Sequence, residues 1–86
     1  MLKADFRTYI EQESVLLTEK INDSKHSAND EVSAGKLQFY LALLEFMDGK
    51  PSNKARGLVG AVNDTLQKLQ VLDSKQTLPS LINELQ

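Results

Sequence analysis

The sequence predicts an all-α fold: a small helical bundle made of a long antiparallel helix hairpin, a third amphipathic helix and a short C-terminal helix. Apolar residues recur at three- and four-residue intervals over most of the chain, which is the spacing of one helix face. No run alternates apolar and polar residues with β-branched enrichment, so strand signals are missing. Residues 37–47 are apolar or aromatic at nine of eleven positions, and such a helix has to be covered on nearly every side.

Length and composition predict one domain over residues 1–86, with modest stability. The chain has no cysteine and a single histidine, His26, which excludes a disulfide and makes a zinc site implausible. A fold this small therefore has to rely on close helix packing or on oligomerisation.

The first helix is expected at about residues 2–21, with its apolar stripe interrupted at Glu13 and Ser14. A polar connection follows at about residues 23–28, and His26 is expected to be a solvated residue within it. The stripe consists of Leu2, Phe6, Tyr9, Ile10, Val15, Leu16, Leu17 and Ile21.

The second helix is expected to begin near Ser27 or Asn29 and to end at Met47. Its end is signalled by Gly49 at the C′ position and by Pro51 two residues later.

The apolar residues of this second helix divide into two stripes, separated by a strip that carries Gln38 and Glu45. We expect the first stripe to pack on the first helix. The second has to be covered by the later helices or by a partner. The first stripe is Leu37, Tyr40, Leu41, Leu44 and Met47; the second is Phe39, Leu43 and Phe46.

The third helix is expected to start at Ser52 or Asn53 and to carry the cleanest amphipathic stripe, from Ala55 to Leu72. Close approach of another helix would explain the glycines in these helices. A polar break then precedes a short last helix opened by residues 77–79, which needs a surface on which to dock. The glycines are Gly35, Gly57 and Gly60, and the polar outer face of the third helix is Asn63, Asp64, Gln67, Lys68 and Gln70.

Three cations, Lys50, Lys54 and Arg56, surround the expected start of the third helix and form a weak candidate anion site. The second and third helices with their short turn also fit the outline of a DNA-binding helix-turn-helix. The mildly acidic net charge of −2 makes nucleic acid an improbable partner.

No set of residues points to catalysis, because the lone histidine lies in a polar connection and neighbouring carboxylates diverge on a helix. Only Glu45 offers a remote enzymatic or small-molecule role. The N-terminal residues do not resemble a signal peptide and the longest apolar run is too short to span a bilayer, so we expect a cytoplasmic protein. No cofactor is expected.

By elimination, the favoured function is a non-enzymatic protein–protein interaction module: a small adaptor, inhibitor, immunity or chaperone-like factor, alone or as a homodimer. Its predicted contact residues are Phe39, Leu43 and Phe46, which have the spacing of helix-in-groove anchors. The DNA-binding regulator is the alternative. Size and layout are superficially similar to small bacterial or phage accessory proteins, including bacteriocin immunity bundles, although no motif assigns the chain to such a family.

Overall fold

Four helices form the part of the chain that the computed structural model describes, residues 1–23 and 28–86. They are α1 (Lys3–Asp23), α2 (Ala28–Met47), α3 (Asn53–Lys68) and α4 (Leu78–Glu84). No strand occurs in these residues, so the all-α prediction is confirmed. The sequence predictions for His26 and for a helix start at Ser27 lie outside the described residues.

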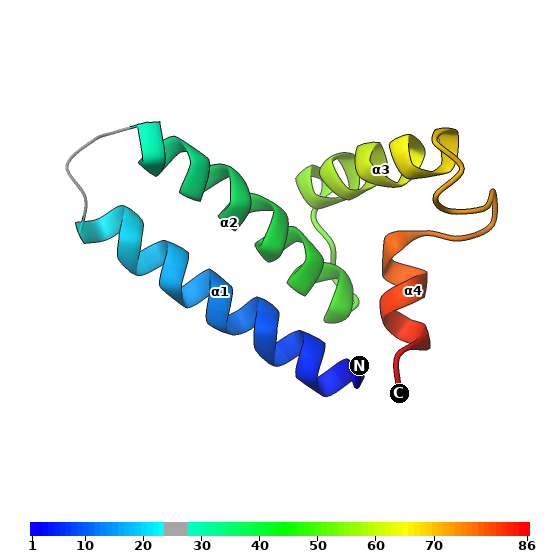
Figure 1. Ribbon diagram of the computed structural model, residues 1–86, viewed down its shortest axis with the longest axis horizontal. Coiled ribbons are helices and arrows are strands. Elements are labelled where there is room, and N and C mark those ends of the chain that lie inside the picture. Colours follow the sequence, from blue (N-terminus) through cyan, green and yellow to red (C-terminus); the bar gives the residue numbers. More distant parts are fainter. Residues whose placement is uncertain (24–27) are drawn as a thin grey trace.

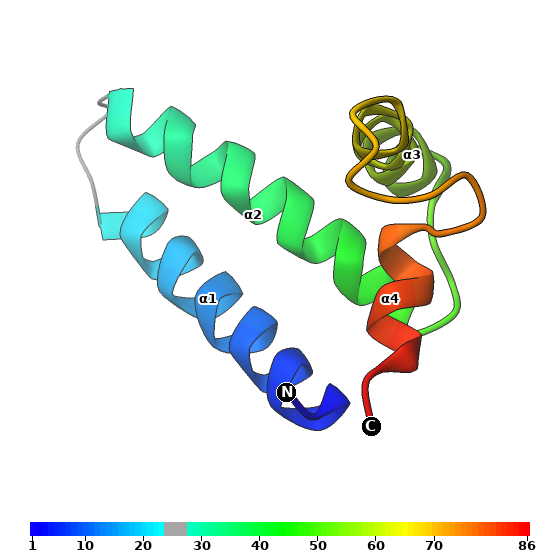
Figure 2. The same cartoon turned by 45° about the vertical axis from the view of Figure 1, so that its right-hand side comes forward.

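The α1 and α2 helices lie side by side, and α3 and α4 lie at the C-terminal end of α2 (Figures 1 and 2). The hydrophobic core lies at that end, where all four helices contribute. Val59 and Ile10 are the most deeply buried, at 0% and 1% exposed. The whole core cluster is Ile10, Ala42, Leu43, Ala55, Val59 and Ile82.

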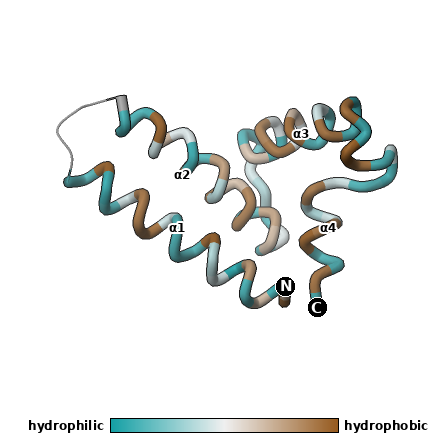
Figure 3. The backbone as a smooth tube through the Cα atoms, in the orientation of Figure 1, coloured by the Kyte–Doolittle hydropathy of each residue, from teal (hydrophilic) through white to brown (hydrophobic). Residues whose placement is uncertain are grey.

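The face of α1 that meets the bundle differs from the predicted stripe. Ser14, expected to interrupt the stripe, is buried, and its hydroxyl donates to the carbonyl of Ile10 at 2.8 Å. Val15 and Leu16, expected within the stripe, are 56% and 58% exposed. A serine whose hydroxyl is satisfied by its own helix can face a neighbouring helix at little cost, so hydropathy alone misplaces it. Hydrophobic and hydrophilic segments alternate along α1 (Figure 3).

The end of α2 follows the sequence prediction. Gly49 has φ +76°, its N–H donates to the carbonyl of Phe46, and the N–H of Lys50 donates to the carbonyl of Glu45. These two bonds define a Schellman motif, which favours glycine because of the left-handed backbone. Ser52 then caps α3 by accepting the N–H of Ala55 at 3.1 Å, so one of the two predicted start residues is the N-cap.

The end of α3 comes earlier than the sequence suggests. The helix stops at Lys68, Leu69 is 68% exposed, and only Leu72 of the last two stripe residues is buried. Gln70 adopts φ 62° and makes the same kind of motif, with the N–H of Val71 bonded to the carbonyl of Leu66. Because glutamine rarely takes this conformation, the sequence carries no stop signal here.

The prediction that glycines mark close helix contacts is wrong. A methyl group added at Gly35, Gly57 or Gly60 would meet nothing within 4 Å. Instead, α3 reaches the core through Ala55 and Val59. These glycines therefore lower helix propensity without a packing reason within the described chain.

The short α4 is fixed to the bundle at several points. Thr77 and Ser80 form a capping box at its start, and the N–H of Leu78 donates to Oδ1 of Asn63 at 2.8 Å. Gln67 donates its Nε2 to the carbonyl of Gln76 at 2.7 Å. Two residues expected on the outer face of α3, Asn63 and Gln67, thus hold the segment that leads into α4. The chain ends also meet, since the N–H of Lys3 donates to the carbonyl of Gln86 at 2.9 Å (Figure 1).

Candidate partner-binding crevice

The predicted contact stripe lies largely within the bundle. Leu43 is 3% exposed, while Phe39 and Phe46 are partly buried and pack against the core. Leu43 can therefore support a contact surface but offers almost no area of its own. Partner binding by Phe39 and Phe46 stays a prediction.

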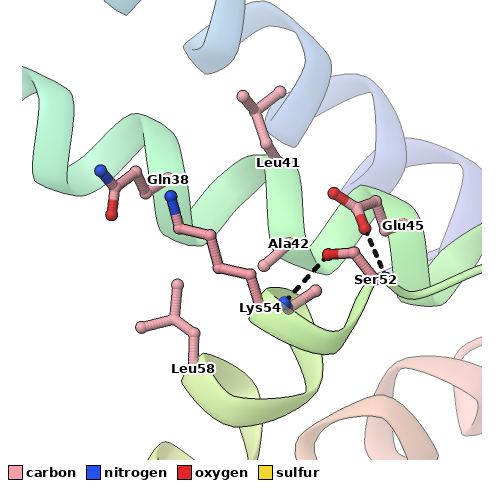
Figure 4. Close-up of a pocket in the computed structure, with 8 residues that line it drawn as sticks. Gln38, Leu41, Ala42, Glu45, Ser52, Lys54 and Leu58 are labelled. Carbon is pink, nitrogen blue, oxygen red and sulfur yellow. Dashed lines mark hydrogen bonds between the residues drawn. The ribbon is translucent and has the colours of Figure 1, made fainter.

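Leu41 does not follow the other residues of its predicted stripe, because it is 45% exposed. It lines a crevice between α2 and α3 (Figure 4). Ala42 also lines the crevice from α2, and Ala55 and Leu58 line it from α3. The result is an apolar hollow beside a leucine that remains open to solvent.

The volume of this crevice is about 130 Å³. A cavity of roughly 150 Å³ holds a benzene-sized apolar group. Small-molecule sites are usually about 300–1,000 Å³. The crevice is therefore the size of one apolar side chain and too small for an ordinary metabolite pocket.

Glu45 lines one side of the crevice and fixes the geometry between α2 and α3. Its Oε1 accepts the backbone N–H of Ser52 at 2.7 Å. This hydrogen bond from the Ser52 backbone lowers the pKa of Glu45 below its ordinary value, and a second, smaller contribution comes from the Ser52 side chain. The sequence placed Glu45 on a solvent-facing strip but gave no sign that it binds the start of the next helix.

The three predicted anion-binding cations, Lys50, Lys54 and Arg56, are all exposed, and only Lys54 lines the crevice. Its side chain extends across the crevice toward Gln38 (Figure 4). The carboxylate of Glu45 already lies at the positive end of α3, where an external anion would have to bind. Anion binding stays a prediction, because the described residues do not bring these three cations together around one site.

Metal-binding clusters and membrane-spanning helices are absent from the described residues. Residues 1–23 and 28–86 contain no group of three His, Cys, Asp or Glu side chains able to hold a metal ion. None of the four helices is both long and apolar enough to cross a bilayer. Comparison with known proteins found no matching family model, curated protein or solved structure.

Proposed function

We propose that this protein is a non-enzymatic protein–protein interaction module, a small adaptor, inhibitor, immunity or chaperone-like accessory factor. Its partner inserts one apolar side chain into the crevice between α2 and α3. The observation that supports this is the solvent-open crevice with apolar residues from both helices, Leu41 of α2, which is 45% exposed, and Leu58 of α3.

The polar residues at the crevice would orient the partner. Glu45 is an acceptor held in place by Ser52, and Lys54 is an exposed cation on the opposite helix. An apolar anchor between two opposite charges gives a partner helix one favoured direction, because charges at the rim select orientation more than they add affinity. Phe39 and Phe46 hold α2 in position from the core side.

The test places a photo-crosslinking phenylalanine analogue at position 58 and, as a control, at position 69, which is exposed outside the crevice. The protein captured from native cells at position 58 alone is then purified and titrated with the unlabelled chain. Leu41→Glu should weaken its binding at least tenfold, and Leu69→Glu less than about twofold, with equal helicity by circular dichroism. Equal capture at both positions, or equal losses for both variants, would contradict the proposal.

The second candidate, a DNA-binding regulator, rests on one observation. The exposed side of α3 carries Lys54, Arg56 and Lys68 against a single acid, Asp64. Titration of duplex DNA at increasing salt discriminates the two functions. For DNA binding, the logarithm of the association constant should fall by about 0.9 per phosphate contact for each tenfold rise in salt concentration. Such a slope, with weaker binding by Arg56→Gln, would favour DNA over a protein partner.

A further inference from the structure

A second depression lies on the hairpin itself, away from the α2–α3 crevice. It has a volume of about 240 Å³ and lies between α1 and α2. Leu16, 58% exposed, is the largest open apolar side chain that lines it. Its remaining lining residues are Glu13, Leu17 and Lys20 of α1 and Lys36 and Tyr40 of α2.

The α1 residues in this depression form a self-complementary series. Glu13 and Lys20 lie seven residues apart, which is about two helical turns, and Leu16 and Leu17 lie midway between them. If a second identical helix runs antiparallel with its midpoint at the same level, each Glu13 faces a Lys20 across the contact. Each Leu16 then faces Leu17 of the other copy.

The charges in this series are available for such a contact. Glu13, Lys20 and Lys36 lie outside the ion pairs that join Arg7 to Glu11 and to Asp48 in the described chain, and Glu13 also interacts with the hydroxyl of Tyr9. An open leucine between two opposite charges, neither of which is in those ion pairs, is an arrangement that a copy of the same surface complements.

We propose that this surface is the contact of a two-fold symmetric homodimer, in which the α1 helices of two copies pack antiparallel. The two-fold axis passes between Leu16 and Leu17. Leu16 packs on Leu16 and Leu17 of the partner, and Glu13 pairs with the partner's Lys20 at both ends. The contact is separate from the crevice and does not rest on the proposed function. One helix edge is smaller than the about 800 Å² per partner of a standard interface, so the expected dissociation constant is micromolar or weaker.

Sedimentation equilibrium of the full chain from about 5 µM to 1 mM tests the dimer. Leu16→Glu should raise the dissociation constant at least tenfold, because it buries two carboxylates at the two-fold axis. Val71→Glu is the matched control, 66% exposed and outside the hairpin, and should change it less than about twofold. A chain that is monomeric at 1 mM, or equal weakening by both variants, would overturn the proposal.

Charge exchange tests the register. Glu13→Lys and Lys20→Glu should each weaken the dimer about threefold to tenfold, since each creates two like-charge pairs. The double variant should restore the dissociation constant to within about twofold of the original. A mixture of the two single variants should form the heterodimer in preference to either homodimer. If the double variant stays as weak as the single ones, or if the single variants have no effect, the antiparallel α1 contact is wrong.

Discussion

The two halves of α2 are equally helical but are covered very differently. In the C-terminal half, Ala42 and Leu43 are 4% and 3% exposed, and α1, α3 and α4 all lie near that end (Figures 1 and 2). In the N-terminal half, Ser33 is the one fully buried side chain among the described residues, and Val32 is 57% exposed. The local sequence therefore determines where α2 is helical. Packing of the other helices against it determines how much each half contributes to the stability of the fold.

This difference has consequences for folding and for binding. The C-terminal half holds most of the buried apolar surface, so opening it should cost nearly the whole free energy of unfolding. The N-terminal half is covered mainly by α1 and can open at lower cost. The α2–α3 crevice lies at the well-packed half, where the surface is held in a defined shape, whereas the proposed α1 dimer contact extends beside Lys36 of the other half.

The largest effect should come from removing a core side chain at the covered end. Ile82 of α4 is 4% exposed and lies beside Phe46 and Met47 of α2. Ile82→Ala should lower the free energy of unfolding by about 2–5 kcal/mol, because it removes buried methyl groups and leaves a cavity.

The matched control is Val32→Ala in the uncovered half, with an expected change within about 0.5 kcal/mol. Urea denaturation followed by circular dichroism measures both. Similar losses for the two variants would mean that the N-terminal half is covered as well as the C-terminal half.

The elements that the sequence predicts well are those set by local signals. Gly49 and Pro51 mark the end of α2, and Ser52 marks the start of α3, because a left-handed cap and an N-cap each depend on one residue type. The end of α3 is missed because Gln70 occupies a position that usually carries glycine. Ser14 is missed because its burial depends on α2 rather than on its own helix.

The candidate site is less predictable than the fold. The sequence shows that Leu41 and Leu58 are apolar, but whether they pack together or line a crevice depends on how α2 and α3 meet. That geometry is fixed partly by the hydrogen bond from Ser52 to Glu45, a contact between residues seven apart across a turn. Hydrophobic periodicity contains no information about such a bond, so the sequence indicated Phe39, Leu43 and Phe46 and gave no sign of the crevice.

A smaller change in the free energy of unfolding is expected from alanine at two glycines, with opposite signs because their backbone conformations differ. Gly57 is helical and a methyl group there meets nothing within 4 Å, so Gly57→Ala should raise the free energy of unfolding by up to about 1 kcal/mol. Gly49 also has open space but has φ +76°, so Gly49→Ala should lower it by about 1 kcal/mol. For a domain of this size, 1 kcal/mol corresponds to about 4–8 °C in thermal midpoint.

Gly35→Ala extends this comparison to the N-terminal half of α2. The added methyl group again meets nothing within 4 Å, so stabilisation is expected there too. Loss of stability at Gly35 or Gly57 would show that another chain approaches the glycine in solution, as in an assembly.

The smallest effect should be a pH dependence localised to the covered half. The hydrogen bond from the Ser52 backbone lowers the pKa of Glu45 in the folded chain below the value of about 4.3 for an unperturbed glutamate. In the pH range between the two values the unfolded chain binds more protons than the folded one at this site. The stabilisation is therefore fully present above about pH 5 and is lost as the pH falls through the folded pKa.

The measurement is the urea midpoint from pH 7 to pH 3 for the original chain and for Glu45→Gln, which keeps the shape and removes the charge. The variant should have a lower midpoint at pH 7 and a smaller loss on acidification, so that the two curves converge at low pH. Glu19→Gln, in which an exposed carboxylate of α1 is removed, is the matched control. Because Glu45 is solvent-accessible and screened, the difference should be small, and high salt should reduce it further. Parallel curves for the original chain and Glu45→Gln would mean that the charged carboxylate does not join α2 to α3 in solution, and that the shape of the crevice is set by apolar packing alone.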